Sequence, residues 1–278
     1  MKDPVSANPT EAERVLREFL HYPLNDGLQI LQRFAKLEGA VVGEGDGPME
    51  RFVYVPGSRK HPVLLVAHVD TVWDQHYQQE QKGMPPTYGE ELITSNDPAA
   101  GIGGDDRAGC ALLWLLKDSG HSLLLLDGEE KGHYAAKYLQ EKRKSVLRKL
   151  NRHAYILALD LPGERYCHYH NVPNCRKFSR FFEENFDCIP MPRNFGSDLS
   201  YLCKGACGAN LSIGVYRMHR PEETLNLSQW LRTYDKLCSG LLGEQAMFRT
   251  RKLIRSFRFV EKKLKCLWAW ILKLRKAR

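Results

Sequence analysis

The sequence predicts an α/β fold in which helices cover a largely parallel β-sheet, and three observations lead to this prediction. Short apolar runs, typical of buried parallel strands, occur within residues 63–67, 121–126 and 154–159. Segments with helical features lie between and around them. The length of 278 residues suffices for one large α/β domain or two small ones, and 43% hydrophobic with 27% charged residues is an ordinary globular composition.

The elements before the first buried strand are predicted from capping and breaking residues. A helix is expected over residues 10–37, with Thr10 as its cap and a break at 23–27, where Pro and Gly occur. Residues 51–56 predict a short strand that ends in Pro-Gly. Residues 74–98 are polar and rich in Gln, Pro and Gly, so we expect surface loops there.

The strand at residues 63–67 runs directly into His68 and Asp70. Ligands of open α/β sheets bind beyond the carboxyl ends of the strands, so His68 lies where a site would form. A carboxylate two residues later can accept the second imidazole N–H, which fixes the tautomer of a metal-ligating histidine. By themselves, however, these two residues also fit an ordinary polar loop.

A glycine-rich segment, residues 101–104, precedes Asp105 and Asp106 and a further predicted helix. Glycines allow close approach of the backbone, and the Asp pair can cap the helix. A phosphate-binding loop is a poor interpretation, because two carboxylates would repel the anion and no Gly-Lys-Ser/Thr follows. A glycine-rich helix start without further function stays the alternative.

Two more strands end in carboxylates. The run at 121–126 leads to Glu129 and Glu130 before a helix, and the run at 154–159 leads to Asp160. Adjacent glutamates at a strand-to-helix turn can point in different directions and serve different purposes; a negatively charged helix start is the simpler explanation.

After residue 160 the alternation of apolar runs and predicted helices is less regular. Residues 196–198, Gly-Ser-Asp, open a predicted helix at 199–203, and residues 211–216 predict a strand that leads to His219. A helix through residues 230–237 follows.

Two histidines and five carboxylates gather at these strand ends. They are His68, Asp70, Asp105, Glu129, Glu130, Asp160 and His219. Such a set suits zinc, or a harder ion such as manganese or cobalt. Four or five carboxylates are too many for one ion but reasonable around two, where one acid bridges.

The order of these motifs resembles that of the co-catalytic dinuclear zinc peptidases, a group that includes peptidase T, carboxypeptidase G, the aminoacylases and the single-domain zinc aminopeptidases. The matching motifs are His-x-Asp at 68–70, Gly-Gly-Asp-Asp-Arg-Ala-Gly at 103–109, Glu-Glu at 129–130, Asp160, Gly-Ser-Asp at 196–198 and His-x-Pro-x-Glu at 219–223. The resemblance covers about residues 60 to 230, and the order and spacing of the motifs make it specific.

The resemblance implies two Zn²⁺ ions, with Mn²⁺ or Co²⁺ as alternatives, and a role for each ligand. Asp105 would bridge both ions. His68 and Asp160 would complete one site, and Glu130 and His219 would complete the other. The substrate-binding residues stay open.

Two more roles follow from the same resemblance. Asp70 would orient His68, and Glu129 would be the general base that takes a proton from water. An Asp at the position of Asp160 is commoner in the aminopeptidase-like members, which favours an aminopeptidase-like exopeptidase. The alternatives are a deacylase of N-acyl amino acids or a carboxypeptidase-type amidohydrolase, so the substrate would be a peptide or an N-acyl amino acid.

The resemblance also implies the architecture: a single-domain, three-layer α/β/α sandwich with a mixed, mostly parallel central sheet. Peptidase T-like enzymes insert a lid and dimerisation domain before the Gly-x-x-Asp-like motif, but here only residues 161–195 separate Asp160 from that motif. The oligomeric state is therefore left open. A non-catalytic relative that serves as a binding scaffold is the second class of function.

Several other polar residues have simpler explanations. Arg107 and Arg217 could bind a substrate carboxylate, although ion pairs with neighbouring acids are the default, and His133 could line the site or lie on the surface. The Cys-His-Tyr-His segment at 167–170, with Cys175, fits no established zinc spacing, which favours a substrate-facing loop or plain surface.

The basic character of the chain lies in its last residues. Residues 247–278 hold twelve Lys or Arg and one Glu; subtracting +11 from the net charge of +8 leaves −3 for residues 1–246. We therefore predict a catalytic domain over 1–246 and a basic amphipathic helix over 247–278. A heptad seam supports the helix: Leu253, Phe257, Val260, Leu264, Leu267, Ile271 and Leu274.

This helix, with Trp268 and Trp270, suits peripheral attachment to an anionic membrane. Packing on the parent domain is the alternative; a coiled-coil partner or nucleic acid is weaker. No uncharged apolar run of 18 residues and no apolar signal core are present, and eight scattered cysteines suggest reduced thiols. We expect a cytoplasmic protein, with the membrane-peripheral alternative.

Overall fold

The computed structural model describes residues 9–75, 84–170, 172, 174–191 and 196–250. The helices are α1 (Pro9–Leu20), α2 (Leu28–Ala35), α3 (Gly104–Leu115), α4 (Tyr134–Glu141), α5 (Lys144–Leu150), α6 (Arg176–Asn185), α7 (Leu199–Leu202) and α8 (Leu227–Gly240), with a 3-10 turn η1 (Val72–Gln75). The strands are β1 (Val41–Glu44), β2 (Arg51–Val55), β3 (Leu64–His68), β4 (Thr87–Tyr88), β5 (Leu92–Thr94), β6 (Ser122–Leu126), β7 (Ile156–Leu161), β8 (Tyr166–His168), β9 (Ile189–Pro190), β10 (Gly208–Ser212), β11 (Val215–Tyr216) and β12 (Thr224–Asn226).

The main sheet has eight strands in the order β1-β2-β6-β3-β7-β10-β8-β9. Its four central strands, β6, β3, β7 and β10, are parallel, whereas β1, β2 and β8 run antiparallel to a neighbour. The carboxyl ends of the central strands therefore meet at one edge of the sheet. The predicted mixed, mostly parallel sheet is confirmed.

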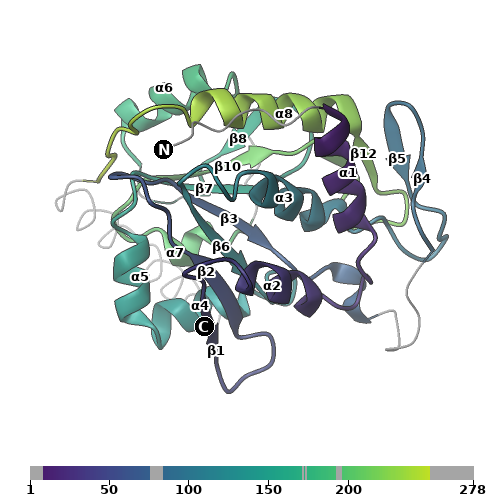
Figure 1. Cartoon of the computed structure of the whole chain (residues 1–278), viewed down its shortest axis with the longest axis horizontal. Coiled ribbons are helices and arrows are strands. Elements are labelled where there is room, and N and C mark those ends of the chain that lie inside the picture. The colour runs from purple at the N-terminus through teal and green to yellow at the C-terminus, as the bar shows by residue number, and fades with distance from the viewer. Residues whose placement is uncertain (1–8, 76–83, 171, 173, 192–195, 251–278) are drawn as a thin grey trace, which may run out of the picture.

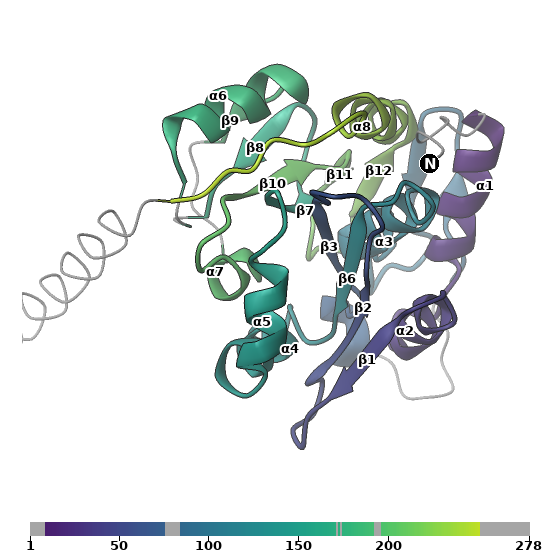
Figure 2. The ribbon, with the colours of Figure 1, turned by 60° about the vertical axis from the view of Figure 1, so that its left-hand side comes forward.

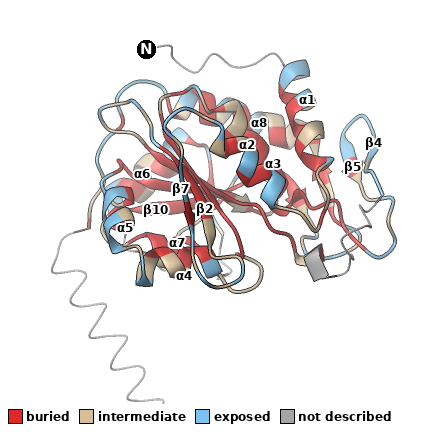
Figure 3. Cartoon of the chain, turned by 60° about the horizontal axis from the view of Figure 1, so that its bottom comes forward, coloured by how far each residue is buried: buried red, intermediate tan, exposed pale blue. Residues whose placement is uncertain are grey.

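Helices cover both faces of this sheet, which gives the predicted three layers (Figure 1 and Figure 2). Alternate residues of β3 face opposite sides: Leu65 packs with α1, α2, α3 and α8, while Val66 packs with α4, α5 and α7. Figure 3 shows the strands buried between these layers. Every residue of β3 and β6 is buried, which explains their continuous apolar sequences.

A second sheet corrects two expectations from the sequence. Residues 74–98 are not only loops, because β4 and β5 pair there with β12 and β11 in a four-stranded antiparallel sheet. Residues 211–216 are not one strand, because β10 ends at Ser212 and Gly214, with φ of +76°, turns the chain into β11. This small sheet carries the loop between β11 and β12, which contains His219.

The last described residues lie against the main domain. The backbone N–H of Phe248 donates to the carbonyl of Ala154, and its carbonyl accepts from Cys207. Its ring packs against Phe178 and Phe181. Residues 247–250, where the predicted basic helix was to begin, are not helical, and Arg249 forms a β-bridge with Ala206. Residues 251–278 lie outside the described residues, so the helix over them and the domain boundary at 246 stay predictions.

Two further features concern the whole described chain. Its seven cysteines are all free thiols. Within the residues that the structure describes, we find no helix with both the length and the apolar character needed to span a membrane.

Candidate metal centre

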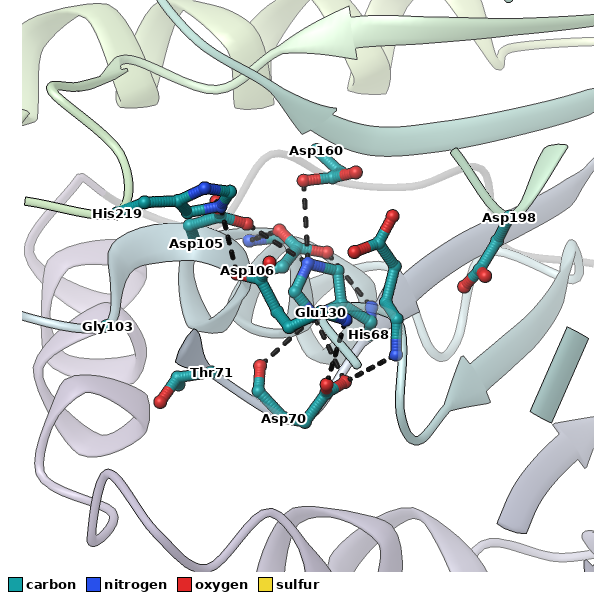
Figure 4. Close-up of polar contacts among 12 residues, drawn as sticks. His68, Asp70, Thr71, Gly103, Asp105, Asp106, Glu130, Asp160, Asp198 and His219 are labelled. Carbon is teal, nitrogen blue, oxygen red and sulfur yellow. Dashed lines mark hydrogen bonds and ion pairs between the residues drawn. The ribbon is translucent and has the colours of Figure 1, made fainter. Parts of the chain in front are cut away.

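Three predicted site residues meet at the carboxyl ends of β3 and β7. His68 is the last residue of β3, Asp160 lies near the end of β7, and Asp105 lies in the first turn of α3. The His68 Nε2 atom is 3.0 Å from Asp105 Oδ1 and 3.5 Å from Asp160 Oδ1. All three side chains offer ligand atoms within 4.8 Å of one another, and Figure 4 shows them converging.

A second group of three uses the other oxygen of Asp105. The His219 Nε2 atom lies 2.9 Å from Asp105 Oδ2 and 3.0 Å from Glu130 Oε1. Asp105 therefore belongs to both groups, with one oxygen toward each histidine. Tetrahedral zinc, with bonds of about 2.0–2.2 Å, separates its donor atoms by about 3.3–3.6 Å. Small shifts of these side chains would therefore let the two groups hold two neighbouring ions.

The same contacts shift the pKa values of these side chains. Burial would lower the pKa of His68, but hydrogen bonds to Asp105 and Asp160 raise it well above its usual value. Hydrogen bonds to Asp105 and Glu130 raise the pKa of His219 to about 11. Burial raises the pKa of Asp160 and of Glu130. Each histidine Nε2 atom thus faces two carboxylate oxygens, and such a set of nitrogen and oxygen donors fits a divalent metal ion.

Asp70 fixes the turn that carries the glutamate pair. Its two carboxylate oxygens accept hydrogen bonds of 3.0 Å from the backbone N–H groups of Glu129 and Glu130. The His68 Nδ1 atom lies 3.1 Å from the carbonyl oxygen of Asp70 and 3.4 Å from its carboxylate. Asp70 therefore connects the end of β3 to the turn after β6. Its backbone carbonyl lies closer to the His68 Nδ1 atom than its carboxylate does.

Asp106, the neighbour of the shared carboxylate, has a structural role. One of its oxygens accepts from the Gly109 N–H and the other from the backbone N–H of His68, each at 3.1 Å. The first contact caps the regular part of α3, as the sequence suggested for this Asp pair. The second ties that helix start to the end of β3.

Glu223 was not assigned a role from the sequence, yet it is buried beside Asp105. Its two oxygens accept from the backbone N–H groups of Gly103 at 2.8 Å and Asp105 at 3.0 Å. Burial raises its pKa to about 8. Glu223 thereby connects the loop of His219 to the loop of Asp105. In the sequence, only its place in the His-x-Pro-x-Glu motif pointed to it.

Glu129 belongs to neither of these two groups. Its Oε1 atom lies 3.1 Å from His133 Nδ1, which is also 3.1 Å from Asp198 Oδ1. Burial alone would lower the pKa of His133, but its hydrogen bonds to the two carboxylates raise it to about 10. His133, which the sequence left between site and surface, therefore lies at the site.

A cavity of about 430 Å³ opens over these groups. Its lining includes Asp105, Glu129, Asp160, Leu161, Pro162, His170, Gly196, Arg217, Met218, His219 and Arg220. The cavity lies beyond the carboxyl ends of the parallel strands, where ligands of α/β proteins bind.

Of the other candidate residues from the sequence, Arg107 lies away from the cavity, whereas Arg217 and His170 line it. Arg107 is fully buried and donates to the carbonyls of Tyr22 and Pro23, so it anchors the segment between α1 and α2 and does not reach the cavity. Arg217 lines the cavity. His170 also reaches it, with Nε2 3.2 Å from the side-chain nitrogen of Asn210.

Comparison with known proteins identifies the fold. No family model matches the sequence, and no curated protein sequence matches it either. Among solved structures, aminopeptidase PepT from Bacillus cereus aligns with a TM-score of 0.62 and 13% identity over 85% of this chain and 99% of that one. A tripeptidase from Staphylococcus aureus gives 0.62 and 12% over 85% and 98%.

A third solved structure, a glutaminyl cyclase from an Acidobacteriales bacterium, aligns with a TM-score of 0.56 and 12% identity over 87% of this chain and 96% of that one. At such identities the likeness concerns the fold alone. With its mixed eight-stranded sheet and two covering helix layers, the chain has a zinc-peptidase-like α/β fold.

Proposed function

We propose that this chain is a metal-dependent hydrolase of peptide bonds, an aminopeptidase-like exopeptidase that uses two ions. The observation that supports this most strongly is the pair of three-residue groups that share Asp105. The likeness of the fold to an aminopeptidase and a tripeptidase supports the same reaction class.

In this proposal His68, Asp105 and Asp160 hold one ion, and Asp105, Glu130 and His219 hold the other. Zn²⁺ suits these nitrogen and oxygen donors, with Mn²⁺ or Co²⁺ as alternatives. When bound, the two ions supply Lewis acidity, which polarises a carbonyl and lowers the pKa of a water molecule.

Glu129 is the proposed general base. Its side chain lines the cavity and takes part in neither ligand group, so its carboxylate can accept a proton from the attacking water and pass it to the leaving amine. Asp70 keeps this carboxylate in place through the backbone of the glutamate turn. The cavity over the two groups receives the scissile bond and limits its contact with bulk water.

The test combines metal content with hydrolysis of matched peptides. We expect about two ions per chain by elemental analysis, and chelator-sensitive hydrolysis of short peptides with a free N-terminus in preference to their N-acetylated forms. Preference for the acetylated series would indicate a deacylase or carboxypeptidase. Cyclisation of an N-terminal glutamine without cleavage would indicate a cyclase. A chain without bound ions under metal-replete conditions would indicate a non-catalytic scaffold.

Membrane attachment through residues 247–278 is a separate part of the proposal, supported by the basic and aromatic sequence of that segment. Because Phe248 packs on the domain, truncation after Thr250 is the appropriate variant. We expect the truncated protein to keep hydrolysis and to lose binding to anionic vesicles. Unchanged vesicle binding would contradict the attachment.

A further inference from the structure

A third cluster of ligand-type side chains lies beside the two groups that share Asp105. It consists of Glu129, which follows β6, His133, which precedes α4, and Asp198, which precedes α7. Their ligand atoms all lie within 4.8 Å of one another. Figure 4 places Asp198 on the opposite side of His68 from His219, so this cluster is at the other end of the site.

Two carboxylates of this cluster share one imidazole nitrogen. The His133 Nδ1 atom faces one oxygen of Glu129 and one of Asp198, each at 3.1 Å, but one ring nitrogen can donate only one hydrogen. Even a protonated imidazole leaves one of the two negative charges uncompensated in a site where the three side chains are between 7% and 18% exposed. A divalent cation with a neutral imidazole and two carboxylates would be neutral.

The geometry also suits a cation. Zinc bonds of about 2.0–2.2 Å in a tetrahedral arrangement separate the ligand atoms by about 3.3–3.6 Å. Both distances from His133 Nδ1 to the carboxylates are within a few tenths of an ångström of that range. The cluster also adjoins the cavity, because Glu129 and Gly196 line it and a Cβ on Gly196 would lie only 3.2 Å from His133 Nε2.

We propose that Glu129, His133 and Asp198 form a third, weaker site for a divalent cation, and that its occupation inhibits the enzyme. The site itself depends only on these three side chains. The inhibition rests on the proposed function, in which Glu129 is the general base. A carboxylate that binds a cation is a weaker base for the proton of the attacking water, so occupation of the third site lowers turnover.

The experiment measures bound zinc and hydrolysis on the same samples of full-length protein as free zinc is raised from nanomolar to micromolar concentrations. We expect two tightly bound ions, then a third ion whose binding follows the loss of turnover. In His133→Ala and in Asp198→Asn, the two tight ions should remain, the third should be lost, and the inhibitory zinc concentration should rise by about tenfold or more.

His61→Ala serves as the matched control, because this histidine contacts Glu244, away from the site, and the variant should bind three ions like the wild type. A wild type that never binds more than two ions would overturn the third site, as would a third ion that persists in both variants. Three ions without inhibition of a working hydrolase would overturn the inhibitory role. Three ions in a chain that hydrolyses no peptide would leave the site standing and reject the proposed function instead.

Discussion

The carboxylate of Glu223 accepts a hydrogen bond from the backbone N–H of Asp105, 118 positions earlier in the chain. Its other oxygen accepts from Gly103 in the same loop. The residue that both ligand groups share is therefore held by the segment that carries His219. These two hydrogen bonds fix Asp105 and the loop of His219 relative to each other, although they come from distant parts of the sequence.

We expect Glu223→Gln to weaken zinc binding by about 10- to 100-fold, because the amide nitrogen would face a backbone N–H that now donates to a carboxylate oxygen. Competition with a chromogenic chelator measures the affinity. Glu222→Gln, at the exposed neighbouring position, is the matched control and should bind zinc like the wild type. Equal affinity in the two variants would contradict the positioning role of Glu223.

The sharing of Asp105 predicts different metal contents for two substitutions. Asp105→Ala removes a ligand from both groups and should leave almost no tightly bound zinc, whereas Glu130→Ala removes a ligand from one group and should leave about one ion per chain. Elemental analysis after dialysis against trace zinc measures both. If Asp105→Ala kept one ion at full affinity, the two groups would be independent and the bridging assignment wrong.

The role of Glu129 is tested by the isosteric change Glu129→Gln. The amide keeps the shape of the side chain but cannot accept the proton, so we expect turnover to fall by about 10²- to 10⁴-fold while the two tight ions and the fold are retained. Steady-state kinetics on a free-N-terminus peptide, with metal content from the same sample, provides the measurement. Near wild-type turnover in a metal-loaded variant would remove Glu129 from the proposed mechanism.

Part of this site could be predicted from the sequence because it follows neighbouring parallel strands. His68, Glu130 and Asp160 stand at or after the ends of β3, β6 and β7, and apolar strand sequences identify such ends. The α/β sandwich follows from the same strands. The functional roles of these residues stay predictions that the experiments above test.

Other parts could not be derived from sequence patterns. The loop of His219 is carried by β11 and β12, which have only two and three residues and show no usable alternation. His133 and Asp198 are in contact although they are 65 positions apart in the sequence. His133 also has a φ of +62°, and a histidine in the sequence does not predict this left-handed backbone conformation. Contacts of this kind depend on the positions of loops in the folded protein, which the local sequence pattern does not determine.

Two buried histidines away from the site make the stability of the fold depend on pH. His121 Nδ1 accepts from the Val63 N–H at 3.0 Å, and its Nε2 donates to the carbonyl of Leu241 at 3.0 Å. His153 lies 2.8 Å from the carbonyl of Leu150 through Nδ1 and 2.7 Å from the Ser122 hydroxyl through Nε2. Burial lowers the pKa of each histidine to about 4.

A histidine with a folded pKa near 4 and an unfolded pKa near 6.5 is neutral in the folded chain while the unfolded chain already binds a proton. Its contribution to stability is therefore complete above pH 6.5 and is lost as the pH falls toward 4, by roughly 3 kcal/mol for each histidine. We expect His121→Gln and His153→Gln to lower stability at pH 7 and to reduce the further loss between pH 6.5 and 4. Urea unfolding at several pH values, with zinc present throughout, measures both effects. A double variant with the same pH dependence as the wild type would show that acid destabilisation does not arise from these two rings.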